Sequence, residues 1–215
     1  MHLSSVARCA ALLLCFVLPA CSQAPSIGEA PAGEFAAEGL HPVRNSGFQS
    51  AYVLPGADLP SYRVIGIAPL ELETLQINAT PMTGTLRRDW ELTPERAGAL
   101  AATWDAAMRR AFRDYQLGAS GESALRIEAA LVSIGRGRPS ATTIGGAIQP
   151  VGSSEDVVEI TGEFRLYDSA EGTLLAVIRD SRTITSVAMS RTVGPSMQRL
   201  FGSWAALLHT RVSGR

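Results

Sequence analysis

The sequence contains no lysine, although 19 of its 215 residues are basic; all 19 are arginine. The absence of lysine excludes Schiff-base catalysis and the phosphate-binding lysine of Walker-type nucleotide sites. Histidine and cysteine are scarce, with three of each, and none has the spacing of a zinc or haem motif. No Gly-x-Ser-x-Gly element is present. We therefore expect no metal, no cofactor and no enzymatic activity.

The charge balance disfavours nucleic acid as a partner. The formal net charge is −1, and removal of residues 1–20, which contain Arg8 and no acid, changes it to −2. Nucleic-acid-binding domains neutralise phosphates with a basic surface, which requires an excess of positive charge. We predict that the protein has no nucleic-acid partner.

The amino terminus has the organisation of an export signal. Arg8 supplies a positive charge, and Cys9–Leu18 is an almost wholly apolar run. This run is shorter than the roughly 20 residues that a transmembrane helix needs. The following LPAC, which ends at Cys21, resembles the lipobox of bacterial lipoprotein signals. We predict that residues 1–20 are a lipoprotein signal peptide and that Cys21 is the lipidation site.

Cys21 becomes the only thiol of the mature chain, because Cys9 and Cys15 leave with the signal. It then has no disulfide partner in an oxidising compartment. A lipidated Cys21 would carry a diacylglycerol and an amide-linked acyl chain such as palmitate, which together anchor a protein stably. Ser22 differs from the Asp that tends to retain lipoproteins in the inner membrane, so we expect the outer membrane, facing the periplasm. The alternative is a plain secretory signal that leaves a free thiol.

The composition divides the mature chain in two. Residues 21–46 are rich in Ala, Pro, Gly, Ser and Glu and show no hydrophobic period, which predicts a flexible tether. The remaining residues, 47–215, are enough for a single domain with its own core.

Periodicity predicts six main elements in this domain. Tyr62–Ala68 is an apolar, β-branched run before Pro69, typical of a buried strand. Thr93, with Pro at the next position, begins an amphipathic helix that we expect to end near Gly118. Alternation of apolar and polar residues predicts strands at residues 123–134, 157–167 and 173–183, and turn residues join the last two. An apolar stripe predicts a closing helix from residue 194 onward.

The predicted fold class is α+β, a two-layer α/β sandwich. The element order is strand, helix, three strands and helix. We expect a mixed sheet of about four strands with two amphipathic helices on one face.

Several short segments of the sequence together resemble those of a known family. They include GFQSAY from Gly47, YRVIGIAPLEL, ALRIEAAL, IQPVG and SWAALLHTRV. Together they are similar to the bacterial lipoproteins grouped as domain of unknown function 3313, over about Gly47 to Val212. The resemblance implies an envelope lipoprotein with a small α/β domain and no assigned activity. The element order is also similar to that of periplasmic accessory domains, such as the amino-terminal domain of TolB-type proteins.

Two acids on one strand are the nearest approach to a catalytic pair. Glu159 and Glu163 lie four residues apart, or roughly 13 Å from the rise of a strand, which is far for a glycosidase-type site. Arg126, Glu128 and Arg165 are predicted nearby, so we interpret the group as a cross-strand charge ladder. His209, near the end of the last helix, is interpreted as a partly exposed helix residue rather than a ligand.

The long glycine-rich loop Gly135–Ser154 is the other candidate site. Loops of this length in compact domains tend to be functional or disordered. One hypothesis is contact with a protein partner or the lipid surface; the other is a loop folded over the domain's own core. The residues proposed for contact are Arg136, Arg138, Ile144, Ile148 and Val151.

The sequence therefore favours a membrane-anchored periplasmic lipoprotein that acts as a non-enzymatic accessory or binding module of the cell envelope. We expect an envelope protein as its partner. The alternatives are a carrier of lipids or small molecules, and an envelope hydrolase without a recognisable motif. An apolar pocket would favour the carrier, and a cleft with acids of raised pKa would favour the hydrolase.

Overall fold

The computed structural model describes residues 24–78, 91–118, 124–137, 141–144, 147–150, 157–185 and 194–215. The predicted lipidation site Cys21 lies outside these ranges. Within them, no helix combines the length and the apolar character needed to cross a membrane.

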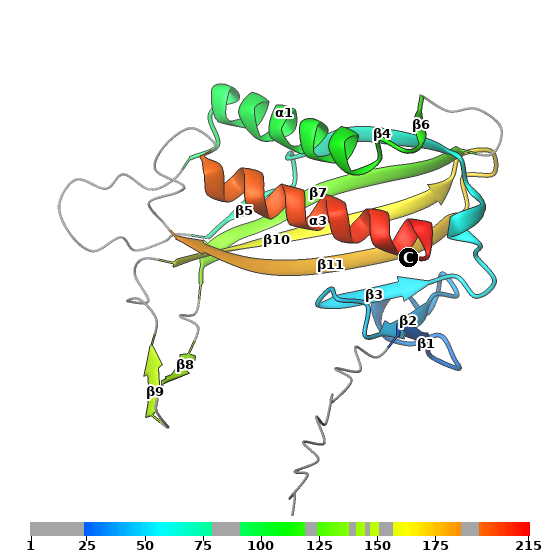
Figure 1. The fold of residues 1–215 in the computed structure, drawn as a ribbon, viewed down its shortest axis with the longest axis horizontal. Helices are drawn as coiled ribbons and strands as arrows, with labels where there is room; N and C mark the ends of the chain where they lie inside the picture. Colours follow the sequence, from blue (N-terminus) through cyan, green and yellow to red (C-terminus); the bar gives the residue numbers. More distant parts are fainter. Residues whose placement is uncertain are drawn as a thin grey trace, which may run out of the picture.

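The six main elements occur in the predicted order. They are β4 (Val64–Glu71), α1 (Pro94–Ala111), β7 (Ala124–Arg136), β10 (Val157–Asp168), β11 (Leu174–Thr185) and α3 (Pro195–Ser213). β4 pairs with β7 in parallel, whereas β7, β10 and β11 pair antiparallel. Both helices lie on the same side of the sheet (Figure 1), which confirms the predicted arrangement.

The sheet is larger than predicted. It has nine strands in the order β1-β2-β3-β11-β10-β7-β4-β6, with β5 paired to β7. The prediction of about four strands is therefore wrong. The additional strands are only two to four residues long, too short to show a hydrophobic period; they are β1 (Ser26–Ile27), β2 (His41–Arg44), β3 (Ser50–Val53), β5 (Gln76–Ile77) and β6 (Gln116–Leu117).

Much of the predicted tether is folded onto the domain. Residues 24–46, the N-terminal segment, contain β1, β2 and a short 3₁₀ helix, η1 (Gly33–Phe35). Leu40 is fully buried and Phe35 is 7% exposed. A hydrogen bond of 2.8 Å joins His41 Nδ1 to the carbonyl of Gly28. The structure thus differs from the expectation of a flexible tether up to residue 46. Phe35 and Leu40, two isolated apolar residues in a segment of polar and small residues, are buried against the domain.

The first helix begins as predicted and ends earlier. The Thr93 hydroxyl accepts a hydrogen bond of 3.3 Å from the Arg96 amide, which caps the helix. The helix ends at Ala111, with Phe112 at the C-cap. The chain then forms β6, parallel to β4, before the expected end at Gly118.

The helix face of the sheet, which packs against α1 and α3, carries an aromatic core. The Phe164 ring lies 5.5 Å from Trp104 and 5.4 Å from Trp204, measured between ring centroids. Phe201 packs edge-on against Trp104 at 5.5 Å. Gly162 makes room for this packing, because a Cβ atom there would lie 3.1 Å from the Trp204 ring. Asp180, which is buried, accepts a hydrogen bond of 2.8 Å from the indole nitrogen of Trp204.

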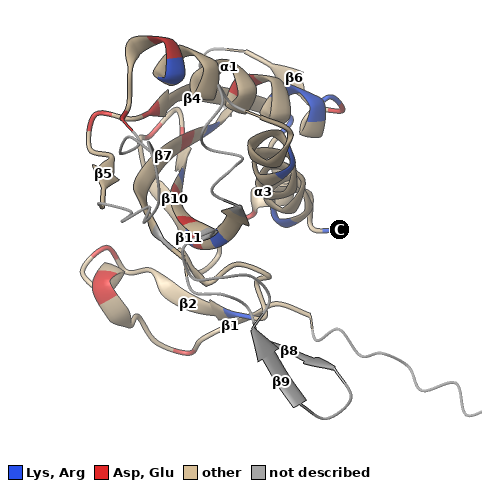
Figure 2. Ribbon diagram, turned by 90° about the vertical axis from the view of Figure 1, so that its left-hand side faces the viewer, with Lys and Arg blue, Asp and Glu red and all other residues tan. Residues whose placement is uncertain are grey.

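The outer face, on the other side of the sheet, is polar as predicted for β10. Glu163 accepts hydrogen bonds from Arg165, at 2.7 Å, and from Arg179. Arg179 also pairs with Glu34 of η1 at 2.5 Å, which ties the N-terminal segment to the sheet. A second, small apolar cluster of Phe35, Leu40 and Val177 lies beneath this segment. In Figure 2, β1 and β2 lie beyond β11, away from the two helices.

The glycine-rich loop is partly regular. Strands β8 (Ala141–Ile144) and β9 (Ala147–Pro150) pair with each other in a separate two-stranded antiparallel sheet. β7 extends to Arg136, so the prediction of one continuous loop from residue 135 to 154 is wrong. The run lacks a continuous apolar pattern, because its strands are short and glycines separate them in the sequence.

Candidate apolar binding pocket

The turn that leads into β3 is held against the last helix. The Ser46 hydroxyl accepts a hydrogen bond of 3.2 Å from the Phe48 amide, a local turn of the kind that serine favours. The Ser46 carbonyl accepts a second bond of 2.6 Å from Nε of Arg211 in α3. Gly47 has φ of +81°, and a side chain there would meet Leu207 and Arg211. These contacts fix Phe48 and the start of β3 beside α3.

The C-terminal end of α3 lies against a second short 3₁₀ helix. Gly214 takes the left-handed conformation, with φ of 71°, and its amide donates to the carbonyl of Thr210. A Cβ atom on Gly214 would lie 3.0 Å from Pro60, so the absence of a side chain permits close approach to η2 (Leu59–Ser61). The chain therefore brings α3, η2 and the N-terminal strands together at one corner of the domain.

An apolar pocket of about 330 Å³ lies at this corner, which we call the corner pocket. Its lining comes from the N-terminal segment, β3, η2, β11 and the end of α3, and most of it is aliphatic or aromatic. Two charged side chains, Arg211 and Arg215, are part of the lining, and no acidic side chain is. The apolar lining includes Pro25, Ile27, Val43, Phe48, Ala51, Tyr52, Val53, Leu59 and Ile178.

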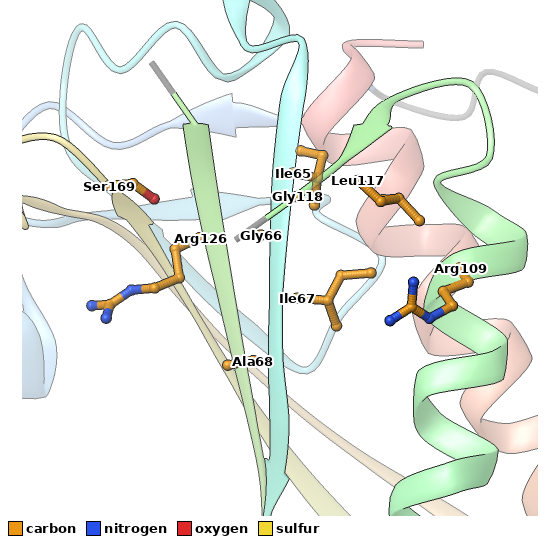
Figure 3. Close-up of a pocket in the computed structure, with 9 residues that line it drawn as sticks. All are labelled: Ile65, Gly66, Ile67, Ala68, Arg109, Leu117, Gly118, Arg126 and Ser169. Carbon is orange, nitrogen blue, oxygen red and sulfur yellow. The ribbon is translucent and has the colours of Figure 1, made fainter. Parts of the chain in front are cut away.

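A second hollow of about 350 Å³ lies at the edge of the sheet beside β4. In Figure 3, Arg126 and Ser169 lie on one side of the strands, whereas Ile67, Leu117 and Arg109 lie on the other. Both arginines already have partners, because Arg109 bonds to Asp105 at 2.8 Å and Arg126 lies 3.3 Å from Glu128. The polar groups of this hollow therefore do not converge on one point.

The described acidic side chains with shifted pKa values accept hydrogen bonds from neighbouring groups. Burial alone raises the pKa of Glu163, but the hydrogen bonds from Arg165 and Arg179 outweigh this and lower the pKa below its usual value. The hydrogen bond from Tyr62 lowers the pKa of Asp168. Within the described ranges, every carboxyl group with a clearly shifted pKa is shifted downward. The same residues hold no group of three or more His, Cys, Asp or Glu side chains that fits a metal ion.

The predicted charge ladder is present only in part, because Glu159 lies opposite Gly135 of β7 and Thr183 of β11 rather than a charged residue. Arg165 faces Glu128 across the β10–β7 register, as expected. Glu163 is 9% exposed and bonds to Arg179 of β11, so its main cross-strand partner lies on the other neighbouring strand. His209 is partly exposed, as predicted, and its Nε2 lies 2.9 Å from Asp114.

The predicted contact residues are only partly described. Ile144 ends β8 and Ile148 lies in β9, opposite Thr143, while Arg136 ends β7. Arg138 and Val151 lie outside the described residues.

Sequence reasoning missed the corner pocket. Its best signal was the GFQSAY segment, whose Phe48, Ala51 and Tyr52 line the pocket. The other walls come from residues as far apart as Pro25 and Arg215, and no local pattern connects them.

The fold defines a two-layer α+β domain with an apolar pocket at one corner. A family model described as "Protein of unknown function (DUF3313)" matches residues 33–208, so the chain belongs to this family. The match confirms the resemblance predicted from the sequence. A search among curated proteins found no match.

Solved structures show distant likeness. The PelC dodecamer from Paraburkholderia phytofirmans is 13% identical, with 77% of this chain and 97% of that chain covered and a TM-score of 0.39. A minor lipoprotein from Acinetobacter baumannii is 11% identical, with 71% and 94% covered and a TM-score of 0.32. The hypothetical protein CT253 from Chlamydia trachomatis is 11% identical, with 72% and 100% covered and a TM-score of 0.39. Scores this low carry no argument about function or assembly.

Proposed function

We propose that this protein is a lipoprotein of the cell envelope, anchored through Cys21 to the periplasmic side of the outer membrane, and that its domain is a non-enzymatic binding module. The apolar run and LPAC segment before residue 22 support the anchor. Glu163 and Asp168 do not suit the role of a general acid, which needs a raised pKa, because hydrogen bonds lower the pKa of both.

The folding of the N-terminal segment carries this proposal. Only three residues separate Cys21 from Pro25, which already lines the corner pocket. An extended chain covers at most about 3.6 Å per residue, so this connection spans about 14 Å. The lipid on Cys21 would therefore hold this corner close to the membrane surface. A tether that was flexible as far as residue 46 would let the domain turn freely and reach much further.

Palmitate labelling tests the anchor. We expect tritiated palmitate to label the wild-type protein and its Cys15→Ser variant, whose substitution leaves with the signal peptide. The Cys21→Ser variant should be unlabelled and should leave the membrane fraction. An unlabelled wild-type protein, or labelling that persists in Cys21→Ser, would contradict the proposal. A sucrose density gradient then separates outer from inner membranes.

Crosslinking of intact envelopes tests the binding module. Native protein purified after crosslinking should retain a stoichiometric envelope protein, identified by mass spectrometry. The Cys21→Ser form, which is not held at the membrane, should retain much less of it. Absence of any enriched partner in the wild-type sample would overturn the accessory role.

The corner pocket favours a second function, that of a carrier for a lipid or small molecule. Its volume of about 330 Å³ lies at the lower end of the range of roughly 300–1,000 Å³ for small-molecule sites. Extraction of the purified protein with organic solvent tests this role: a single compound near one equivalent would support a carrier, and an empty extract would oppose it.

A further inference from the structure

The walls of the corner pocket suit a hydrocarbon chain. Phe48 from the turn before β3, together with Val53 of β3, Leu59 of η2 and Ile178 of β11, presents apolar groups to the same space. Ile27, at its N-terminal wall, is 54% exposed. Burying an acyl chain here would remove apolar surface from water on both the ligand and the protein.

The two charged side chains of the pocket lining are both arginines. Arg211 uses Nε to bond to Ser46, which leaves the other donors of its guanidinium group for a second acceptor. The Arg215 side chain is 74% exposed, and its Nη1 lies 3.7 Å from Asp114, a long and weak ion pair. Cations at the C-terminal end of a helix also complement its dipole. The helix dipole explains why arginines are favourable at this end of α3. It does not explain why an apolar pocket lies beside them.

We infer that the corner pocket binds a fatty acid, with its single acyl chain among the apolar walls and its carboxylate toward Arg211 and Arg215. The inference deepens the proposed function, because it names a ligand for the binding module. Charge complementarity selects an acidic head group, since Arg211 and Arg215 are not accompanied by any acid in the pocket lining. The small volume favours one acyl chain over the two of a phospholipid.

The position of the pocket agrees with this ligand. Pro25 and Ile27 form its N-terminal wall, and the predicted anchor Cys21 is four residues before Pro25. The membrane from which a fatty acid would partition is therefore adjacent to the pocket in the anchored protein.

Calorimetric titration of the mature Cys21→Ser protein with dodecanoate, below its micelle concentration, tests the inference. We expect saturable binding of one equivalent. Dodecanol, which has the same chain and no charge, should bind at least tenfold more weakly. No binding of dodecanoate would overturn the inference, and equal binding of dodecanol would overturn the role of the arginines. The assay does not need the lipid anchor, so its failure and the failure of palmitate labelling are independent results.

Pocket-filling variants distinguish the corner pocket from nonspecific adsorption. Ala51→Leu and Val43→Phe add side-chain volume to the lining. The control Ala106→Leu makes the same substitution as Ala51→Leu, but on the exposed surface of α1. Either filling variant that keeps the wild-type melting temperature should bind dodecanoate at least tenfold more weakly. Ala106→Leu should bind as the wild type does. Unchanged affinity in a stable filling variant would exclude this pocket.

The charge requirement has its own variant. Arg215→Gln removes an exposed side chain, so we expect the melting temperature to stay within a degree or two of the wild type. Its affinity for dodecanoate should fall about three- to tenfold, while its weak affinity for dodecanol stays constant. An equal loss for both ligands would show that Arg215 does not recognise the carboxylate.

Discussion

The helix face of the sheet is covered by two long helices through a continuous aromatic and aliphatic core. The outer face meets the N-terminal segment through three buried apolar residues and the ion pair between Arg179 and Glu34. Apolar burial on the helix face is extensive and water is excluded from it. On the outer face, the Arg179 side chain, which pairs with Glu34 of the segment, is 33% exposed. The contrast indicates that the helix layer determines global stability, and that the N-terminal segment can detach at lower cost.

The largest effect should come from the helix face. Trp204→Ala removes a buried indole and leaves Asp180 without one of its hydrogen-bond donors. We expect the free energy of unfolding to fall by about 3–5 kcal/mol, as for other buried aromatic residues. Urea denaturation measures it. Trp204→Phe, which keeps a ring, should cost less; a loss below 1 kcal/mol in Trp204→Ala would contradict the dominance of this face.

An intermediate effect is expected beneath the N-terminal segment. Leu40→Ala removes a fully buried side chain from the small cluster with Phe35 and Val177. We expect a cost of about 2–3 kcal/mol, at the lower end for buried leucines because the cluster is small. Limited proteolysis should now cleave within residues 24–46 while the helices remain intact. Cleavage spread evenly over the chain would show that the two layers unfold together.

The ion pairs of the outer face should give a pH-dependent effect. The pKa of Glu163 is lowered in the folded state, so its contribution is present above its unfolded pKa of about 4.5 and is lost as the pH falls through the folded value. Glu163→Gln should cost about 1 kcal/mol at pH 7, because water screens the partly exposed arginines. The difference between the wild type and the variant should shrink as the pH falls below 4.5 and through the lowered folded-state pKa. A difference that does not change between pH 7 and pH 3 would contradict the pairing.

The smallest effect on stability is expected in the glycine-rich segment. Changing Ile144, Ile148 and Val151 together to Ser should alter the free energy of unfolding by less than about 0.5 kcal/mol, because β8 and β9 form a sheet separate from the nine-stranded one. The same variant should lose its crosslinked envelope partner if these residues make the contact. Unchanged partner capture and unchanged growth under envelope stress would exclude the contact.

The contrast between the two faces also explains which parts of the fold could be predicted from the sequence. The cap at Thr93, the apolar stripe of the last helix and the alternation of β10 each leave a regular pattern, because each element buries one face of a long, regular segment. The N-terminal segment leaves no such pattern, since Phe35 and Leu40 are single apolar residues among Gly, Ala and Glu. The corner pocket was not predictable for another reason: its walls meet only after β3, β11 and α3 have packed.

Hydrogen exchange over residues 24–46 tests the central claim most directly, because a folded segment and a flexible tether differ most in amide protection. The amides of Gly28 and Leu40 donate to the carbonyls of Pro42 and Phe35, at 2.8 Å and 3.2 Å. We predict that both exchange at least a hundredfold more slowly than an unstructured chain, in the mature protein with or without its lipid. Exchange at the unstructured rate throughout this segment would show that residues 24–46 are a flexible tether. It would contradict the proposal that the corner pocket is held at the membrane.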